Sequence, residues 1–432
     1  MSLYKEIREI LKYLRTLQGL REGWPVLLVL ALAFLSTMVP ITIYQQKFAF
    51  FLGNYNINYL EILAPFLILP VFFTVKKNKL ILSFAVFFFC LGVGTMPIAA
   101  SSPINAFCVG CYTAIPFLYI SCIRFTPFEK DLLKWGVLLL CVGIVLQVFI
   151  YGLGLKTYVS SYTGDAIGVS GEVTRVNSTI GAATGTSVYI FMAAIFSSLI
   201  FIRRPLVFWC ILIVSLLAIV VSQSRGGVLM MLCYMAVLVL PMLRESQFRG
   251  GGVFIRILLF GCAILAAGGF LYLKPALVEE WRQRVEYFKG EAFNDAGRGI
   301  RYEEAYDTFL ETNGLGVGLG NYSPRKKMMP FPQGVVGRSS PHNVYLLLLA
   351  ETGVVGFIGY LFLIGAVMWM AWKSGRHMVF FALLIVLTLG HNVEYVYLHI
   401  PHLWVYALLL AYACHQEEFQ GAPRMSRDDA RA

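Results

Sequence analysis

Long apolar runs constrain this chain more than any other feature, because they recur along almost its whole length. About twelve of them reach the roughly 20 residues that a helix needs to cross the hydrocarbon core of a bilayer. The expected spans are 24–43, 56–75, 80–100, 104–123, 132–153, 182–202, 206–223, 227–243, 253–273, 343–372, 377–395 and 399–416. Only 14% of the residues are charged, against roughly 25% in soluble domains. We therefore expect an all-α polytopic membrane protein.

The lysines and arginines indicate how these spans are oriented. One set of connecting segments is rich in them, with Lys76, Lys77, Lys79, Arg124, Lys130, Lys134, Arg203, Arg204, Lys373 and Arg376. The short segments on the other side hold only Lys47, Lys156, Arg175 and Arg225. Because cytoplasmic loops carry the excess of basic residues, both termini are expected in the cytoplasm. The net charge of +11 thus reflects membrane orientation, and we expect no nucleic-acid partner.

The spans predict the organisation of the chain. Residues 1–22 form a basic amphipathic helix on the lipid surface, 23–273 hold spans one to nine, 274–341 form one large non-cytoplasmic loop, 342–416 hold spans ten to twelve, and 417–432 are a cytoplasmic tail. A first loop helix is expected from Pro275 and a second from about Arg298, with Tyr302, Tyr306 and Phe309 as the apolar stripe of the second. The glycine-rich segment 314–320 ends this helix.

Arginines on the non-cytoplasmic side are candidates for binding an anion. Arg225 lies in the sequence Ser222-Gln-Ser-Arg-Gly-Gly227 at the edge of the bilayer, where an arginine is costly unless it has a partner. Arg298 and Arg301 are i, i+3 neighbours whose guanidinium groups can point together and bind a phosphate bidentately. The alternatives are lipid headgroup contact for Arg225 and surface ion pairs for the other two.

A histidine at the start of span ten is a candidate general base. Pro341 marks the start of a helix, which puts His342 in its first turn. The positive end of the helix dipole disfavours an imidazolium there, so His342 stays neutral and can accept a proton. The alternative is a histidine that only caps the helix. Glu351 lies on the opposite face of the same helix and therefore cannot orient His342.

The chain carries no pattern that favours a metal. No DxD sequence occurs on the non-cytoplasmic side, and no HExxH motif is present. His391, Glu394, His399 and His402 have helical spacing that could bind a metal, but such spacing alone is weak support. They are equally suited to line the path of an acceptor. We expect no metal and no cofactor.

These pieces together resemble the O-antigen ligase family. The matching sequences are Ser222-Gln-Ser-Arg225-Gly-Gly, then Gly297-Arg298 with Tyr302 shortly after, Gly316-Val-Gly-Leu-Gly-Asn-Tyr322, and His342-Asn-Val-Tyr-Leu-Leu-Leu-Leu-Ala-Glu351-Thr-Gly353-Val-Val-Gly356. They cover residues 180–360 in the family's order and flank one large loop between spans nine and ten. The first five spans carry no recognised motif.

The resemblance implies a GT-C-like architecture and a glycosyltransferase with a periplasmic active site in the bacterial inner membrane. Its donor is O-antigen on undecaprenyl diphosphate and its acceptor a sugar of lipid A-core. Arg225 and Arg298, or Arg301 in its place, would grip the diphosphate, while His342 takes the acceptor's proton. Asn343, Tyr302, Glu351 and His399 are expected near the acceptor or behind these side chains. A single displacement would invert the anomeric centre without a metal.

Two other functions fit parts of the pattern. Within the superfamily, an O-antigen polymerase or a protein O-glycosyltransferase would share the donor site. A transporter or lipid flippase is the alternative of another class. Transporters tend to show internal repeats and charges at the bilayer midplane, whereas here no repeat is evident and the polar groups gather at one interface.

Overall fold

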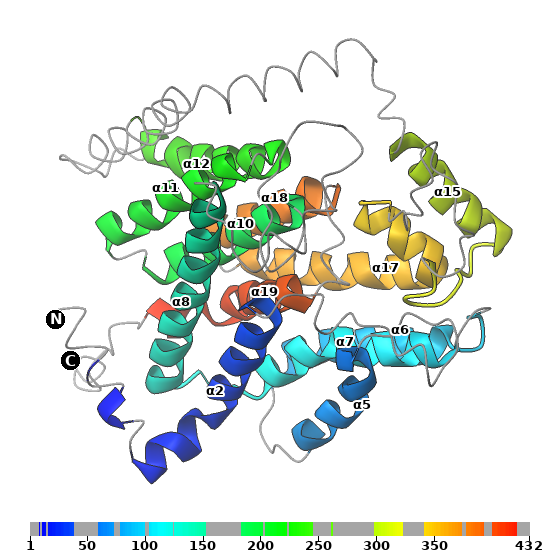
Figure 1. The fold of residues 1–432 in the computed structure, drawn as a ribbon, viewed down its shortest axis with the longest axis horizontal. Coiled ribbons are helices and arrows are strands. Elements are labelled where there is room, and N and C mark those ends of the chain that lie inside the picture. The colour runs from blue at the N-terminus through cyan, green and yellow to red at the C-terminus, as the bar shows by residue number, and fades with distance from the viewer. Residues whose placement is uncertain are drawn as a thin grey trace.

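The computed structural model is built from helices that pack side by side (Figure 1). It describes residues 8, 11–13, 16–38, 59–72, 78–99, 103–123, 125–152, 183–201, 204–222, 224–244, 261, 298–322, 341–373, 377–392 and 400–420. Every regular element in these ranges is an α-helix or a short 3-10 turn. The all-helical class expected from the sequence is therefore confirmed for the described part of the chain.

A helix occupies each expected span except 253–273, of which only residue 261 is described. The helices are α2 (Leu17–Met38), α5 (Tyr59–Phe72), α6 (Lys79–Thr95), α7 (Pro103–Ser121), α8 (Pro127–Gly152), α10 (Ala183–Ile200), α11 (Pro205–Val221), α12 (Arg225–Arg244), α15 (Arg298–Glu311), α17 (Val344–Lys373), α18 (His377–Thr388), η2 (Gly390–Asn392) and α19 (Ile400–Gln420). α15 is the second helix expected in the loop, and it begins at the expected residue; the first, from Pro275, lies outside the described residues.

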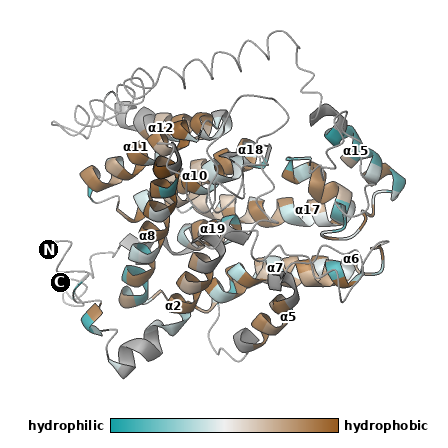
Figure 2. Cartoon of the chain, in the orientation of Figure 1, coloured by the Kyte–Doolittle hydropathy of each residue, from teal (hydrophilic) through white to brown (hydrophobic). Residues whose placement is uncertain are grey.

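The helices have the composition of membrane spans. Pro103–Ser121, Pro127–Ile150 and Val344–Lys373 are long and apolar enough to cross a bilayer, and shorter apolar helices accompany them. Figure 2 shows the apolar colour along most of the bundle, with α15 among the more polar elements. Large apolar side chains also lie on the outside, including Phe66, Leu139, Val355 and Phe362, each at least 66% exposed. In a bilayer these apolar side chains would contact lipid and be removed from water.

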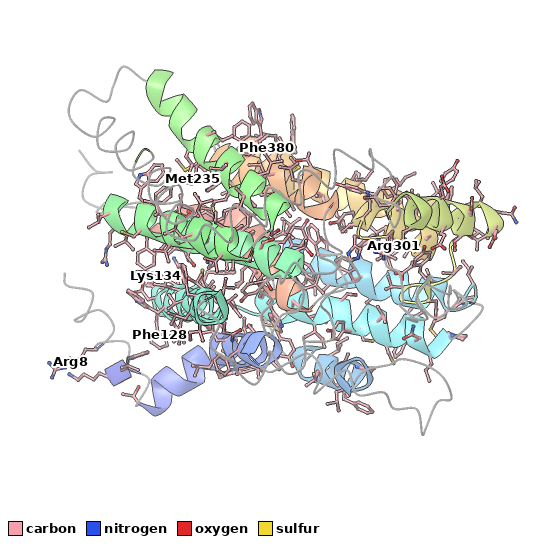
Figure 3. All side chains as sticks on the ribbon, turned by 45° about the horizontal axis from the view of Figure 1, so that its top comes forward. Arg8, Phe128, Lys134, Met235, Arg301 and Phe380 are labelled. Atoms are coloured by element: carbon pink, nitrogen blue, oxygen red, sulfur yellow. The ribbon has the colours of Figure 1, made fainter. Side chains whose placement is uncertain are left out.

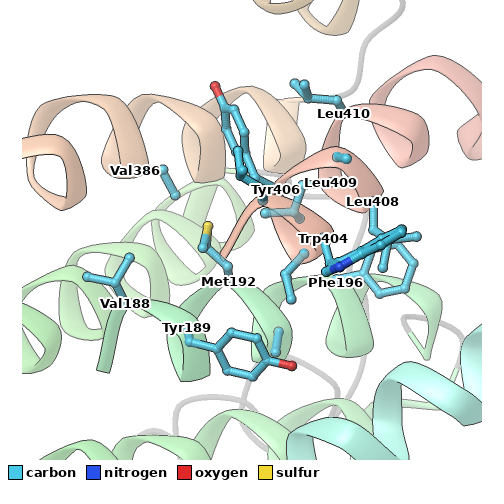
Figure 4. Packing of buried hydrophobic residues seen from close by; sticks show 14 of the residues in the cluster. Val188, Tyr189, Met192, Phe196, Val386, Trp404, Tyr406, Leu408, Leu409 and Leu410 are labelled. Carbon is cyan, nitrogen blue, oxygen red and sulfur yellow. The ribbon is translucent and has the colours of Figure 1, made fainter. Parts of the chain in front are cut away.

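The core of the bundle lies around α10. Every side chain from residue 185 to 199 is buried, as expected for a helix that is enclosed on all sides. Figure 4 shows Met192 and Phe196 of this helix beside Trp404 and Tyr406 of α19. α10 also packs against α8, α11 and α12. It therefore connects helices from the middle of the chain with α19 near its end.

α17 is not one continuous helix, which corrects the expectation of a single span over 343–372. Gly353 has φ 65° and ψ −166°, outside the helical region. The backbone groups released there bond to the glycine-rich turn after α15: the amides of Val317 and Gly318 donate to the carbonyls of Ala350 and Glu351 at 2.9 and 2.8 Å. A buried break of this kind needs such partners, because unpaired backbone groups are costly away from water.

The chain folds back at Gly353. Tyr345 and Tyr360 are fifteen positions apart, which in a continuous helix would separate them by about 22 Å. Yet the ring centroids of both lie close to that of His391, at 5.6 and 6.0 Å. Residues 344–352 therefore form a short arm against a long limb, residues 354–373. The limb alone is about 30 Å long, the thickness of a bilayer core.

Candidate functional site

Arg225 stands at the first position of α12, directly after a tight turn. α11 ends at Val221, with Ser222 as its C-cap. Ser224 opens α12 by accepting a hydrogen bond from the amide of Gly227 at 3.3 Å, and its hydroxyl bonds to that of Ser187 on α10 at 2.6 Å. These bonds fix the start of α12 against α10. The free amides of a helix N-terminus attract anions. An arginine attracts the same kind of ligand.

Gly227 makes this close approach possible. A Cβ atom at this position would lie 2.5 Å from the Cβ atom of Ser187, so only a glycine lets the two helices meet here. Small residues allow such contacts between membrane helices. The second glycine after Arg225 in the motif therefore has a packing reason as well as any functional one.

Arg298 and Arg301 lie in the first turn of α15. Figures 1 and 3 show this helix beside α17 at the edge of the molecule. Arg301 is half-buried. The buried face of α15 is centred on Ala305 and Thr308, at 0% and 7% exposure, while Tyr306 is 51% exposed. This corrects the expected stripe, and the reason is that small side chains allow α15 to pack closely on α17.

Tyr322 marks a cluster of charged groups behind Arg301. Its side chain is 1% exposed. Burial raises its pKa above the ordinary value, the nearby carboxylates of Glu304 and Glu351 raise it further, and Arg301 lowers it. Charges that act on one hydroxyl must lie near it. Arg301 therefore shares its surroundings with two acids, and Glu351, at 2% exposure, lies next to the fold at Gly353.

His342 lies just before the arm of α17 and not in its first turn, which corrects the expected placement. The N-cap is Asn343, whose side-chain oxygen accepts hydrogen bonds from the amides of Tyr345 and Leu346 at 2.9 and 3.0 Å. His342 has φ 48°, a left-handed conformation that is rare outside glycine and recurs at functional sites. Its side chain is half-buried, so it remains within reach of a substrate.

The histidines near the ends of α18 and α19 are held by the protein itself. His391 is fully buried, with Nδ1 2.9 Å from the carbonyl of Val386 and Nε2 2.6 Å from the hydroxyl of Tyr360. The Nε2 atom of His402 lies 2.7 Å from the carbonyl of Gly185. His399 and Glu394 lie outside the described residues. No group of three or more metal-ligating side chains comes together in the described ranges.

α12 and the arm of α17 both contact one short turn, η2. Met230, in the second turn of α12, is the nearest side chain to a Cβ placed on Gly390, at 3.5 Å. On the other side, Tyr345 of the arm stacks on His391. α12, which begins at Arg225, and the arm, which follows His342, therefore both contact η2. Figure 1 shows α15 beside α17 at the edge of the molecule.

Sequence reasoning missed the fold at Gly353 and the residues that hold the arm. Tyr345, Tyr360 and His391 were not singled out for this, because hydropathy gives one uninterrupted run from 343 to 372. The available signal was Gly353 inside that run, since a glycine within a helical pattern marks a possible break.

Comparison with known proteins assigns the segment that carries these features. The family model described as O-Antigen ligase matches residues 210–361, a range that contains Arg225, Arg298, Arg301, His342 and Glu351. A search of curated proteins finds no match. The family match confirms, for residues 210–361, the resemblance to the O-antigen ligase family inferred from the motifs.

Proposed function

We propose that this protein is an O-antigen ligase of lipopolysaccharide synthesis. It transfers O-antigen polysaccharide from undecaprenyl diphosphate to a sugar hydroxyl of lipid A-core. The observation that carries the proposal is that α12 and the α17 arm both contact η2, and that the family model matches the residues that begin these two elements. Transfer from a diphosphate donor to an acceptor hydroxyl needs an anion site near a base. In this proposal the start of α12 supplies the anion site and the start of the arm supplies the base.

The diphosphate is held by Arg225 together with Arg298 or Arg301. The planar fork of an arginine matches two phosphate oxygens at once, and the N-termini of α12 and α15 add backbone amides of the same polarity. Fixed positive charge at the leaving group lowers the barrier for the departing diphosphate. No DxD pair accompanies these arginines on the expected non-cytoplasmic side, so the proposed reaction is metal-independent.

His342 removes the proton from the acceptor. The acceptor oxygen attacks the anomeric carbon, its proton passes to the imidazole, and the bond to the diphosphate breaks with its electron pair. One displacement of this kind inverts the anomeric centre. Retention of configuration in the product would contradict it.

The reaction is proposed for the periplasmic face of the bacterial inner membrane, with both termini in the cytoplasm. The labelled side chains support this orientation. Figure 3 shows Arg8 and Lys134 toward one end of the bundle and Arg301 toward the other. Lys134 belongs to the basic segments expected in the cytoplasm, while Arg301 belongs to the loop expected outside.

The test is a transfer assay with purified protein, donor glycan on undecaprenyl diphosphate and lipid A-core, in the presence of EDTA. Wild type should produce a ladder of glycan-bearing lipid A-core, and His342→Ala should lose it. His377→Ala is the matched control, because His377 begins α18 at the end opposite η2. A ladder that disappears with EDTA would contradict the metal-independent mechanism.

The alternatives give other outcomes in the same assay. Longer glycan on the lipid carrier, without transfer to lipid A-core, would favour an O-antigen polymerase. Transfer to a protein hydroxyl would favour a protein O-glycosyltransferase. Movement of the lipid-linked donor across vesicles with no transfer to any acceptor would favour the transporter or flippase.

A further inference from the structure

The start of the α17 arm is held by a small buried cluster of aromatic rings and hydrogen bonds. We propose that Tyr345, Tyr360 and His391 are positioning residues that fix the arm and thereby place His342 against the acceptor. This inference rests on the proposed role of His342 as the base. It assigns to His391 a task other than metal binding or acceptor contact.

Tyr345 attaches the arm to the end of α18. Its hydroxyl donates a hydrogen bond to the carbonyl of Leu387 at 2.6 Å. Its ring stacks on that of His391, with centroids 5.6 Å apart and planes inclined by 29°, and meets the edge of Phe357 on the long limb at 6.2 Å. A residue three positions after His342 is thus tied to two other helical segments.

His391 is locked in one tautomer by its partners. The carbonyl of Val386 can only accept, so the nearby Nδ1 must carry the proton. The Nε2 atom is then an acceptor, and the hydroxyl of Tyr360 donates to it. Both ring nitrogens are engaged and the side chain is fully buried. The neutral ring is therefore a fixed surface on which Tyr345 stacks.

The arm has a second attachment at its other end. There the amides of Val317 and Gly318 bond to the last carbonyls of the arm, and the amide of Val354 donates to the carbonyl of Gly314 at 2.9 Å. Between the two attachments the arm is only about 14 Å long. Loss of the attachment at Tyr345 would leave the start of the arm held by the packing of Val344, Leu347 and Leu348 alone, so that it could shift about the non-helical Gly353.

A swing of the arm would move His342 more than the arginines. Neither Arg225 nor Arg298 lies on the arm. A displacement of about 1 Å at a reacting group can cost up to a hundredfold in rate. Weakening the cluster should therefore lower kcat and leave the KM for the donor unchanged. Partial unfolding would give the same split by reducing the amount of active enzyme, so kcat is calculated per mole of folded protein.

The first test compares Tyr345→Phe and Tyr360→Phe with wild type in the transfer assay. Each variant keeps its ring and loses one hydroxyl, and we expect kcat to fall about tenfold with donor KM unchanged. Tyr119→Phe is the matched control, because it removes the same kind of bond, from a tyrosine hydroxyl to the carbonyl of Leu67 at 2.8 Å, between α7 and α5. This control should keep full activity.

The second test measures the arm without using activity. Spin labels at Leu349→Cys on the arm and Thr388→Cys at the end of α18, in a protein whose nine native cysteines are replaced, report their separation. Tyr345→Phe should broaden this distance distribution, and Tyr119→Phe should not. An unchanged distribution, or a kcat within twofold of wild type, would overturn the inference. A wild-type protein that transfers no glycan would overturn the proposed function instead, and the catalytic role of the arm with it.

Discussion

At the scale of single residues, the proposed diphosphate site has two candidate arginines on α15. Arg301, Glu304 and Glu351 all act on the pKa of Tyr322, so Arg301 has two acids in its surroundings. Arg298 occupies the first position of the helix, where the backbone amides also favour an anion. The environment therefore favours Arg298 as the principal ligand.

Substitution by lysine separates the two, because lysine keeps the charge and loses the bidentate fork. We expect Arg298→Lys to lower kcat/KM for the lipid-linked donor by one to two orders of magnitude, the equivalent of about 1.5 to 3 kcal/mol for a charged hydrogen bond. Arg301→Lys should cost less than tenfold. Initial rates at varied donor concentration give both values. The reverse order would make Arg301 the principal ligand.

A second residue-scale prediction concerns the fold in α17. A Cβ atom on Gly353 would overlap the carbonyl oxygen of Gly314, and φ is 65° there. The positive φ alone costs an L-residue about 1 to 3 kcal/mol, and the overlap adds to it. Gly353→Ala should therefore lower the thermal unfolding temperature in detergent. Gly365→Ala, on the same helix with no atom within 4 Å of the added Cβ, should not. Equal unfolding temperatures for the two variants would contradict the break in α17 at Gly353.

At the scale of elements, the sequence predicts which helices form better than how they pack. The apolar runs predict each described span, because a bilayer demands helices of a minimum length. They do not predict the break in α17, because the groups that satisfy it come from residues 314–318, far away in the chain. The buried face of α15 was missed for a related reason: close packing selects Ala305 over the larger and more apolar Tyr306.

Two asparagine caps allow an effect on catalysis to be distinguished from an effect on stability. Asn343 caps the arm, and Asn78 caps α6 in the same manner, accepting hydrogen bonds from the amides of Leu80 and Ile81 at 3.1 Å. Replacing either residue by alanine should cost about 1 kcal/mol of stability. Only Asn343→Ala should also lower kcat, because it loosens the helix start that adjoins His342.

Unfolding curves and transfer rates of Asn343→Ala and Asn78→Ala, measured side by side, decide the point. Asn343→Ser, which retains a capping oxygen, should restore most of the lost rate. If Asn78→Ala slows transfer as much as Asn343→Ala does, the cap at the arm has no special part in catalysis.

At the scale of the whole molecule, the first half of the chain supports a site that the second half carries. The hydroxyl of Thr95 accepts a hydrogen bond from the amide of Leu319 at 3.1 Å, and the side chain of Asn105 donates to the carbonyl of Gly320 at 2.8 Å. Helices α6 and α7 thus hold the glycine-rich turn that in turn holds the fold of α17. A supporting role of this kind requires only complementary packing and a few polar contacts. These spans therefore show no motif in the sequence.

The long limb of α17 provides the most direct test of the membrane orientation. Its twenty residues rise about 30 Å, enough to cross the hydrocarbon core without the arm. Leu315, 53% exposed, lies in the turn at its start, and Lys373 ends it. In a protein without its native cysteines, Leu315→Cys should react with a membrane-impermeant maleimide added from the periplasmic side. Lys373→Cys should react only after the inner membrane is opened. Labelling of both cysteines from the periplasm would show that the limb does not span the membrane. The opposite pattern would place the proposed site in the cytoplasm. There the arginines and His342 could not meet a donor presented on the periplasmic side.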